Sequence, residues 1–108
     1  MALPHAQPGQ ALPVQPYGER LAEHKTCALF KSVDLEVMRV VLRAGKSLPP
    51  HRVPGEITIQ CLEGSLIVVA GGEERPLAAG ELLFLRGDVM HSLRARSDAS
   101  ALVTVALK

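Results

Sequence analysis

Two histidines stand where strands are expected to begin, and they are the side chains of this sequence best placed to do chemistry together. His51 follows a Pro-Pro pair at the entry to an alternating segment, and His91 opens the later segment HSLRA. If the two imidazoles meet in one cavity, they could hold Zn²⁺, Fe²⁺, Ni²⁺ or Mn²⁺, given a third ligand and open coordination positions. In the other interpretation, they are hydrogen-bonding groups in a cavity without a metal.

The elements that must position these histidines are short strands. From Thr26 onward, apolar segments alternate with turns rich in glycine, and none keeps a helical period over three turns. About eight strands are expected, which is typical of an all-β sandwich or barrel. Because strand side chains alternate between faces, Ile57, Ile59 and Cys61 share one face, and Val53 is expected on that same interior side. The wall beside the histidines is therefore predicted to be apolar.

The chain of 108 residues is long enough for one domain. Four prolines, at positions 4, 8, 13 and 16, forbid a helix at the start and favour an extended segment. We therefore divide the chain into a Pro-rich extended arm, residues 1–25, and a β-barrel, residues 26–108. A short helical turn is possible between Tyr17 and Lys25.

Composition excludes several classes of function. Aromatic residues make up 3% of the chain and its net charge is +1, which argues against nucleic acid and against an anionic membrane surface as partners. The N-terminus has neither a basic start nor a continuous apolar stretch, so no signal peptide or membrane span is expected. Cys27 and Cys61 form no recognisable disulfide framework, which fits reduced thiols in a cytoplasmic protein.

Around the histidines the sequence resembles the cupin superfamily. Gly45, five residues and then His51 match the start of the first cupin motif, and Gly64 in LEG matches its end. Gly80 and His91 stand in register with the glycine and the histidine of the second motif. The resemblance implies a jelly-roll barrel, also called a double-stranded β-helix, which is often dimeric. It also implies a site inside the barrel that in many members holds a metal.

The departures from the cupin pattern concern that metal site. Val53 replaces the second histidine of the first motif, and Ile57 stands where its glutamate belongs, with Glu56 one residue away. A shift of one residue in a strand turns a side chain to the opposite face. Glu56 is therefore a candidate third ligand beside His51 and His91 only if the preceding Pro-Gly turn is unusual. The second motif departs at Arg86, Asp88 and Ala95.

We therefore expect a small-molecule-binding cupin with an aliphatic cavity. Its predicted ligand contacts are His51, His91, Val53, Ile57, Ile59 and Cys61. Two alternatives stay open: a metal-dependent oxygenase or isomerase, with a divalent Fe, Mn, Ni or Zn ion, and a structural dimer without a ligand. A homodimer is expected because the C-terminal strand is apolar on both faces. The sequence does not decide whether the protein is an enzyme.

Overall fold

The computed structural model describes residues 5–107, which form antiparallel β-strands after one short 3₁₀ helix. None of the helices in this range is long and apolar enough to cross a membrane. In chain order the elements are η1 (Gly18–Glu23), β1 (Cys27–Lys31), β2 (Leu35–Leu42), β3 (Ser47–His51), β4 (Ile57–Glu63), β5 (Ser65–Ala70), β6 (Glu73–Ala78), β7 (Leu82–Leu85), β8 (His91–Ala95) and β9 (Ala99–Ala106).

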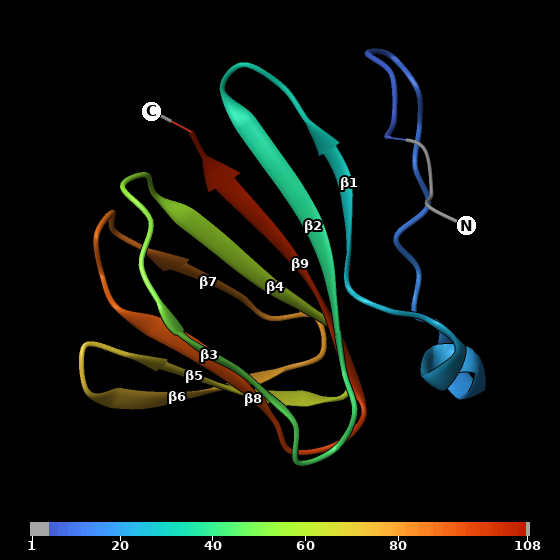
Figure 1. Ribbon diagram of the computed structural model, residues 1–108. Helices are drawn as coiled ribbons and strands as arrows, with labels where there is room; N and C mark the ends of the chain where they lie inside the picture. The colour runs from blue at the N-terminus through green and yellow to red at the C-terminus, as the bar shows by residue number, and fades with distance from the viewer. Residues whose placement is uncertain (1–4, 108) are drawn as a thin grey trace.

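The strands form two sheets that face each other (Figure 1). The five-stranded sheet has the order β1-β2-β9-β4-β7, and the four-stranded sheet has the order β3-β8-β5-β6. Strands far apart in sequence are neighbours in both sheets, as in β2 beside β9 and β5 beside β8. The prediction of an all-β barrel of the jelly-roll type is therefore confirmed.

The core lies between the sheets and is aliphatic, as the alternation along the strands predicts. On β4 the buried residues are Ile57, Ile59 and Cys61, with half-buried residues between them. They pair across the sheet with alternating residues of β9, so the interior faces of both strands are apolar. Burial of such side chains contributes about 1.5–3 kcal/mol each to stability, which makes this face the main source of cohesion.

One strand that positions the site was not anticipated from the sequence. β3 contains Pro49 and Pro50, which have no backbone N–H to donate to a sheet. The strand nevertheless forms because it lies at the edge of the four-stranded sheet and pairs only with β8. Its register is irregular between Leu48 and His51, where the prolines fall. Prolines are tolerated at such an edge, and here they lead the chain to His51.

The N-terminal arm packs against the barrel rather than extending away from it. The amide of Ala6 donates to the carbonyl of Leu29 on β1 at 2.9 Å. The Arg39 guanidinium on β2 points away from the core and donates to the Gln15 carbonyl at 2.7 Å. The Tyr17 ring lies over that guanidinium, with its centroid 3.8 Å from Cζ, a favourable cation–π distance. The arm thereby covers the outer face of β1 and β2.

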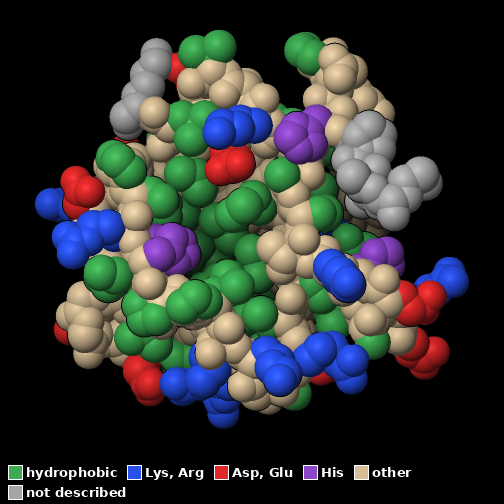
Figure 2. All heavy atoms as spheres, in the orientation of Figure 1, with side chains coloured by type: hydrophobic (Ala, Val, Ile, Leu, Met, Phe, Trp, Pro, Cys, Tyr) green, Lys and Arg blue, Asp and Glu red, His purple; other side chains and the backbone are tan. Residues whose placement is uncertain are grey.

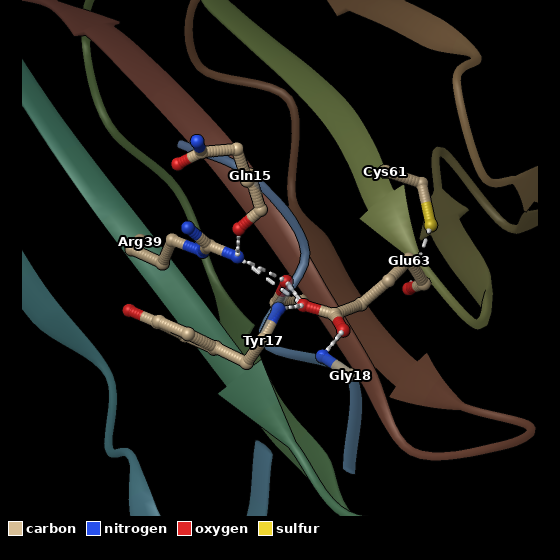
Figure 3. A network of polar contacts seen from close by, with 7 residues as sticks. Gln15, Tyr17, Gly18, Arg39, Cys61 and Glu63 are labelled. Carbon is tan, nitrogen blue, oxygen red and sulfur yellow. Dashed lines mark hydrogen bonds and ion pairs between the residues drawn. The ribbon is translucent and has the colours of Figure 1, made fainter. Parts of the chain in front are cut away.

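A buried ion pair within the five-stranded sheet is the point at which the arm is attached (Figure 3). Arg39 is 2% exposed, and its Nη2 lies 3.2 Å from Oε2 of Glu63 at the end of β4. The backbone amides of Tyr17 and Gly18 both donate to the Glu63 carboxylate at 2.9 Å, and the Ser100 hydroxyl donates to it as well. The two charges compensate each other and the carboxylate is well hydrogen-bonded, whereas Nε of Arg39 is buried without a hydrogen-bond partner among the described residues.

This environment lowers the pKa of the Glu63 carboxyl below its ordinary value. Burial by itself acts in the opposite direction and raises the pKa. The hydrogen bonds from Ser100, from the amides of Tyr17 and Gly18, and from Arg39 outweigh that effect. The folded state therefore favours the ionised carboxylate at this position.

Gly64, in the turn between β4 and β5, provides a stability test of the fold. Its φ is +77°, and a Cβ there would lie 2.1 Å from the carbonyl oxygen of Asp98. Gly72 has a similar φ of +82°, but a Cβ there would meet nothing within 4 Å. Both Gly→Ala changes incur left-handed strain of about 1 kcal/mol. Only Gly64→Ala adds a steric overlap, so it should lower the free energy of unfolding by about 2 kcal/mol more. Equal losses in urea denaturation would show that the turn is not tightly packed.

Candidate functional site

A cavity of about 230 Å³ opens between the two sheets. Figure 2 shows hydrophobic side chains gathered in the hollow on this face of the molecule. The volume is below the 300–1,000 Å³ typical of sites for drug-sized ligands, so it suits a compact molecule. The lining residues come from both sheets and from the loop after β3: Glu36, Met38, Val40, Leu48, His51, Val53, Pro54, Gly55, Ile57, Ile59, His91, Leu93, Val103, Val105, Ala106 and Leu107.

The structure brings His51 and His91 together at this cavity. They are directly paired residues of the antiparallel strands β3 and β8. Their ring centroids are 4.4 Å apart, and the ring planes are inclined by 55°. His91 is 4% exposed, whereas His51 is exposed at the end of its edge strand. Both rings line the cavity. The ring of His91 is enclosed by the protein, whereas His51 is also accessible from outside.

Hydrogen bonds to the backbone determine which ring nitrogen each histidine presents to a ligand. Nδ1 of His51 lies 3.2 Å from the Pro49 carbonyl oxygen, and Nδ1 of His91 lies 2.9 Å from that of Val89. A carbonyl oxygen only accepts, so both Nδ1 atoms carry the proton. In neutral rings this leaves both Nε2 atoms with a free lone pair. Neither Nε2 has a hydrogen-bond partner among residues 5–107.

Five of the six predicted ligand contacts line the cavity, namely the two histidines and Val53, Ile57 and Ile59. Cys61 does not. Its side chain is fully buried in the core, and its Sγ donates to the carbonyl oxygens of Glu63 and Gly64 at 3.3 and 3.6 Å. Burial raises the pKa of this thiol. Cys61 shares the interior face with Ile57 and Ile59, but it lies further along β4, where side chains fill the barrel.

Glu56 does not reach the histidines. It is exposed and lies outside the cavity, while the following residue, Ile57, points inward and is 3% exposed. Glu56 contributes only its backbone carbonyl to the fold, which accepts from the amide of Ala106 at 2.9 Å. Strand alternation thus holds despite the Pro-Gly turn. The hypothesis that Glu56 completes a metal site is not supported.

The donor set at the cavity does not fit a tightly bound metal ion. Within the described part of the chain, no three His, Cys, Asp or Glu side chains are grouped so that they could hold a metal. The cavity wall holds two paired imidazoles and the carboxylate of Glu36 on β2, which is not grouped with them, whereas catalytic zinc sites take three protein ligands. Val53 and Ile57 both line the wall, at the positions where the cupin motif has a histidine and a glutamate. Aliphatic side chains therefore stand at the two positions where the cupin motif has metal ligands.

Several lining residues were missed by sequence reasoning, although alternation could have found them. Glu36, Met38 and Val40 follow one another at every second position of β2, and all three line the cavity. Val103 and Val105 do the same on β9. These positions can be read from the sequence. The sequence does not show which strands of the opposite sheet face them across the cavity.

Comparison with known proteins agrees with this fold. The family described as cupin domain matches residues 38–107. This match covers more than half of the chain, and the protein is a member of the cupin family. No curated protein matches it.

Solved structures similar to this chain include a protein of unknown function, a cupin protein and an enzyme. A conserved protein of unknown function from Streptococcus pyogenes is 17% identical with a TM-score of 0.77, over 100% of this chain and 96% of that one. An RmlC-like cupin protein from Desulfovibrio desulfuricans is 25% identical with a TM-score of 0.72, over 95% and 98%. Salicylate 1,2-dioxygenase from Pseudoaminobacter salicylatoxidans, with gentisate adducts, is 26% identical with a TM-score of 0.64, over 67% and 20%.

Proposed function

We propose that this cupin binds a compact, largely apolar organic molecule between its sheets, with Nε2 of His51 and of His91 as polar contacts. One observation carries the proposal. The cavity wall is hydrocarbon at the positions where a metal-dependent cupin has ligands, yet the paired imidazoles remain. An apolar wall with a few convergent polar groups is the usual composition of a small-molecule site. The two free cysteines support a reducing compartment such as the cytoplasm.

Native mass spectrometry of untagged protein tests this proposal. Wild-type protein, freshly isolated, is expected to carry a non-covalent organic adduct that is lost in the double variant His51→Ala with His91→Ala. The double variant should stay folded, because it truncates one exposed and one buried polar side chain at the cavity and leaves the aliphatic core residues unchanged. His5→Ala, which changes a histidine of the arm, is the control and should keep the adduct. An adduct of unchanged intensity in the double variant would place binding elsewhere.

A metal-dependent oxygenase or isomerase is the second candidate. The likeness to salicylate 1,2-dioxygenase supports it, since that protein is an enzyme and the similarity covers 67% of this chain. The two imidazoles would be the protein ligands of its metal ion. The donor set described above argues against this candidate. Stoichiometric metal in untagged wild-type protein, measured by elemental analysis, would favour it over the first.

We also propose that the protein is a homodimer that associates through the outer face of the five-stranded sheet. Leu82 and Phe84 on the edge strand β7 are 64% and 58% exposed, and they lie beside the uncharged residues Gln60 and Thr58 of β4. An apolar surface without charges can meet a second copy of itself without burying an unpaired ion. A second copy of this chain is therefore sufficient to cover the exposed side chains of Leu82 and Phe84.

Sedimentation equilibrium tests the dimer. Wild-type protein should be dimeric at micromolar concentration, and Phe84→Ser should shift it toward monomer by roughly tenfold or more in dissociation constant. Val33→Ser removes an apolar residue that is 85% exposed at a different place, the β1–β2 turn, and should leave the dimer intact. A wild-type monomer at these concentrations would disprove the proposal.

A further inference from the structure

Glu36 is a carboxylate in the wall of an otherwise apolar cavity, and the function proposed above gives it no role. It lies on β2 and shares the interior side with Met38 and Val40. The residue is half-buried, and its carboxylate has no hydrogen bond or ion pair with any described residue. A carboxylate next to hydrocarbon is costly to desolvate unless something pairs with it.

The polar groups of the cavity wall are all of one hydrogen-bonding kind. Apart from backbone groups, they are the carboxylate of Glu36 and the rings of His51 and His91. Both Nδ1 atoms already donate to backbone carbonyls, so each neutral ring offers an acceptor at Nε2. A carboxylate accepts only. No lysine or arginine is among the lining residues. A ligand that brings hydrogen-bond donors can satisfy these groups, and an anionic ligand cannot.

A basic residue, Lys31, lies opposite Glu36 on the neighbouring strand. It is the directly paired residue of Glu36 across β1 and β2. Lys31 is exposed and lies outside the cavity wall, and no ion pair joins it to Glu36. Because Lys31 carries a positive charge on the neighbouring strand and does not pair with Glu36, we expect its ammonium group to compete with a ligand for the carboxylate. Removing Lys31 and removing Glu36 should therefore change the affinity for a cationic ligand in opposite directions.

We propose that the ligand of this cavity is a compact apolar amine, and that Glu36 selects it by pairing with the protonated nitrogen. This inference rests on the proposed function, since it names the class of molecule that the same cavity takes. The hydrocarbon part lies against the aliphatic wall, and the ammonium group donates to Glu36. The Nε2 atoms of the histidines accept from further donors of the ligand. Carboxylates and phosphates are excluded because they would meet only acceptors.

Three probes of similar shape test the proposal: pentylammonium, 1-pentanol and pentanoate. Affinities are measured at pH 8 by NMR titration of the full-length protein, labelled with ¹³C in the methyl groups of Ile, Leu and Val. Wild-type protein should bind pentylammonium at least tenfold more tightly than pentanol, and pentanoate most weakly. In Glu36→Gln the ratio of amine to alcohol affinity should fall to near one. In Lys31→Gln it should rise severalfold, because the competing ammonium group is removed.

Glu56→Gln is the matched control. It removes the same charge close to the cavity but outside its wall, so the wild-type ratio should persist. If pentanol binds in the cavity and pentylammonium has no advantage, or if Glu36→Gln keeps the advantage, the inference is overturned while the proposed function stands. If none of the three probes shifts the methyl groups of the cavity wall, the inference and the proposed function both fail.

Discussion

The variant Glu63→Gln is expected to lose about 3 kcal/mol of unfolding free energy, because it leaves the buried Arg39 guanidinium without its counter-charge. Arg39 is 2% exposed, so water cannot replace the carboxylate. The variant also weakens the acceptor of the Tyr17 and Gly18 amides, which tie the arm to the sheet. Urea denaturation followed by circular dichroism measures the loss. The double variant Arg39→Met with Glu63→Gln should recover most of it, since the unpaired buried charge is then absent.

A second ion pair of this chain provides a matched control. Arg20 and Glu23 lie 3.2 Å apart, the same separation as Arg39 and Glu63, but their side chains are 78% and 63% exposed. Exposed pairs contribute little to stability, so Glu23→Gln should be neutral within error. If both single changes cost the same, burial of the Arg39–Glu63 pair does not determine its contribution.

The same carboxylate predicts how stability depends on pH. The pKa of Glu63 is lower in the folded protein than its ordinary value, so its contribution is present above the unfolded-state pKa of about 4.3. It is lost as the pH falls through the lower folded-state value. Asp98, whose pKa is lowered chiefly by a hydrogen bond from the Ala44 amide, acts in the same direction. The stability of Glu63→Gln should therefore decrease less steeply below about pH 4.3 than that of wild type. Parallel curves would contradict this assignment.

The double variant Val53→His with Ile57→Glu should gain zinc affinity by at least about 100-fold over wild type. Both positions line the cavity beside His51 and His91, so the change completes a set of four ligands. Isothermal titration with Zn²⁺ measures the affinity. Because the metal would compensate the carboxylate placed at a position that is 3% exposed in wild type, Zn²⁺ should also raise the melting temperature of the variant.

Moving each new ligand by one residue provides the control for this gain. Arg52→His with Thr58→Glu adds the same side chains, but Arg52 and Thr58 are not part of the cavity wall. This variant should bind Zn²⁺ no better than wild type. Equal gains in Zn²⁺ affinity in both variants would mean that His51 and His91 are not ligands of the bound zinc.

How far the sequence predicts this site depends on the range of the interactions involved. Alternation along β4 correctly places Ile57 and Ile59 at the cavity and, extended back by one residue, excludes Glu56, whereas Val53 reaches the wall from the loop between β3 and β4. It fails for Cys61 because a shared face does not say how far along the barrel the cavity extends. The all-β class follows from the strand and glycine pattern after residue 26, whereas the jelly-roll fold is predicted from the resemblance to the cupin motifs.

The features that were missed depend on pairing between distant segments. β3 forms only because β8 offers it an edge, and its two prolines would argue against a strand in isolation. Arg39 and Glu63 are charged residues on strands and would be expected in water. They are buried because the arm, through Gln15 and Tyr17, folds over them. Neither a strand pattern nor a motif carries that information.

The most direct test of the central claim, a small-molecule site at the paired histidines, follows the histidine rings while ligands bind. Protein labelled with ¹⁵N in histidine and ¹³C in methyl groups is titrated with a library of cationic, neutral and anionic fragments. We predict that the fragments that bind will shift the ring signals of His51 and His91 together with the methyl signals of Leu93 and Val103, which share the cavity wall. Binding that leaves both rings and these methyl groups unshifted, or a library without any binder, would contradict the claim.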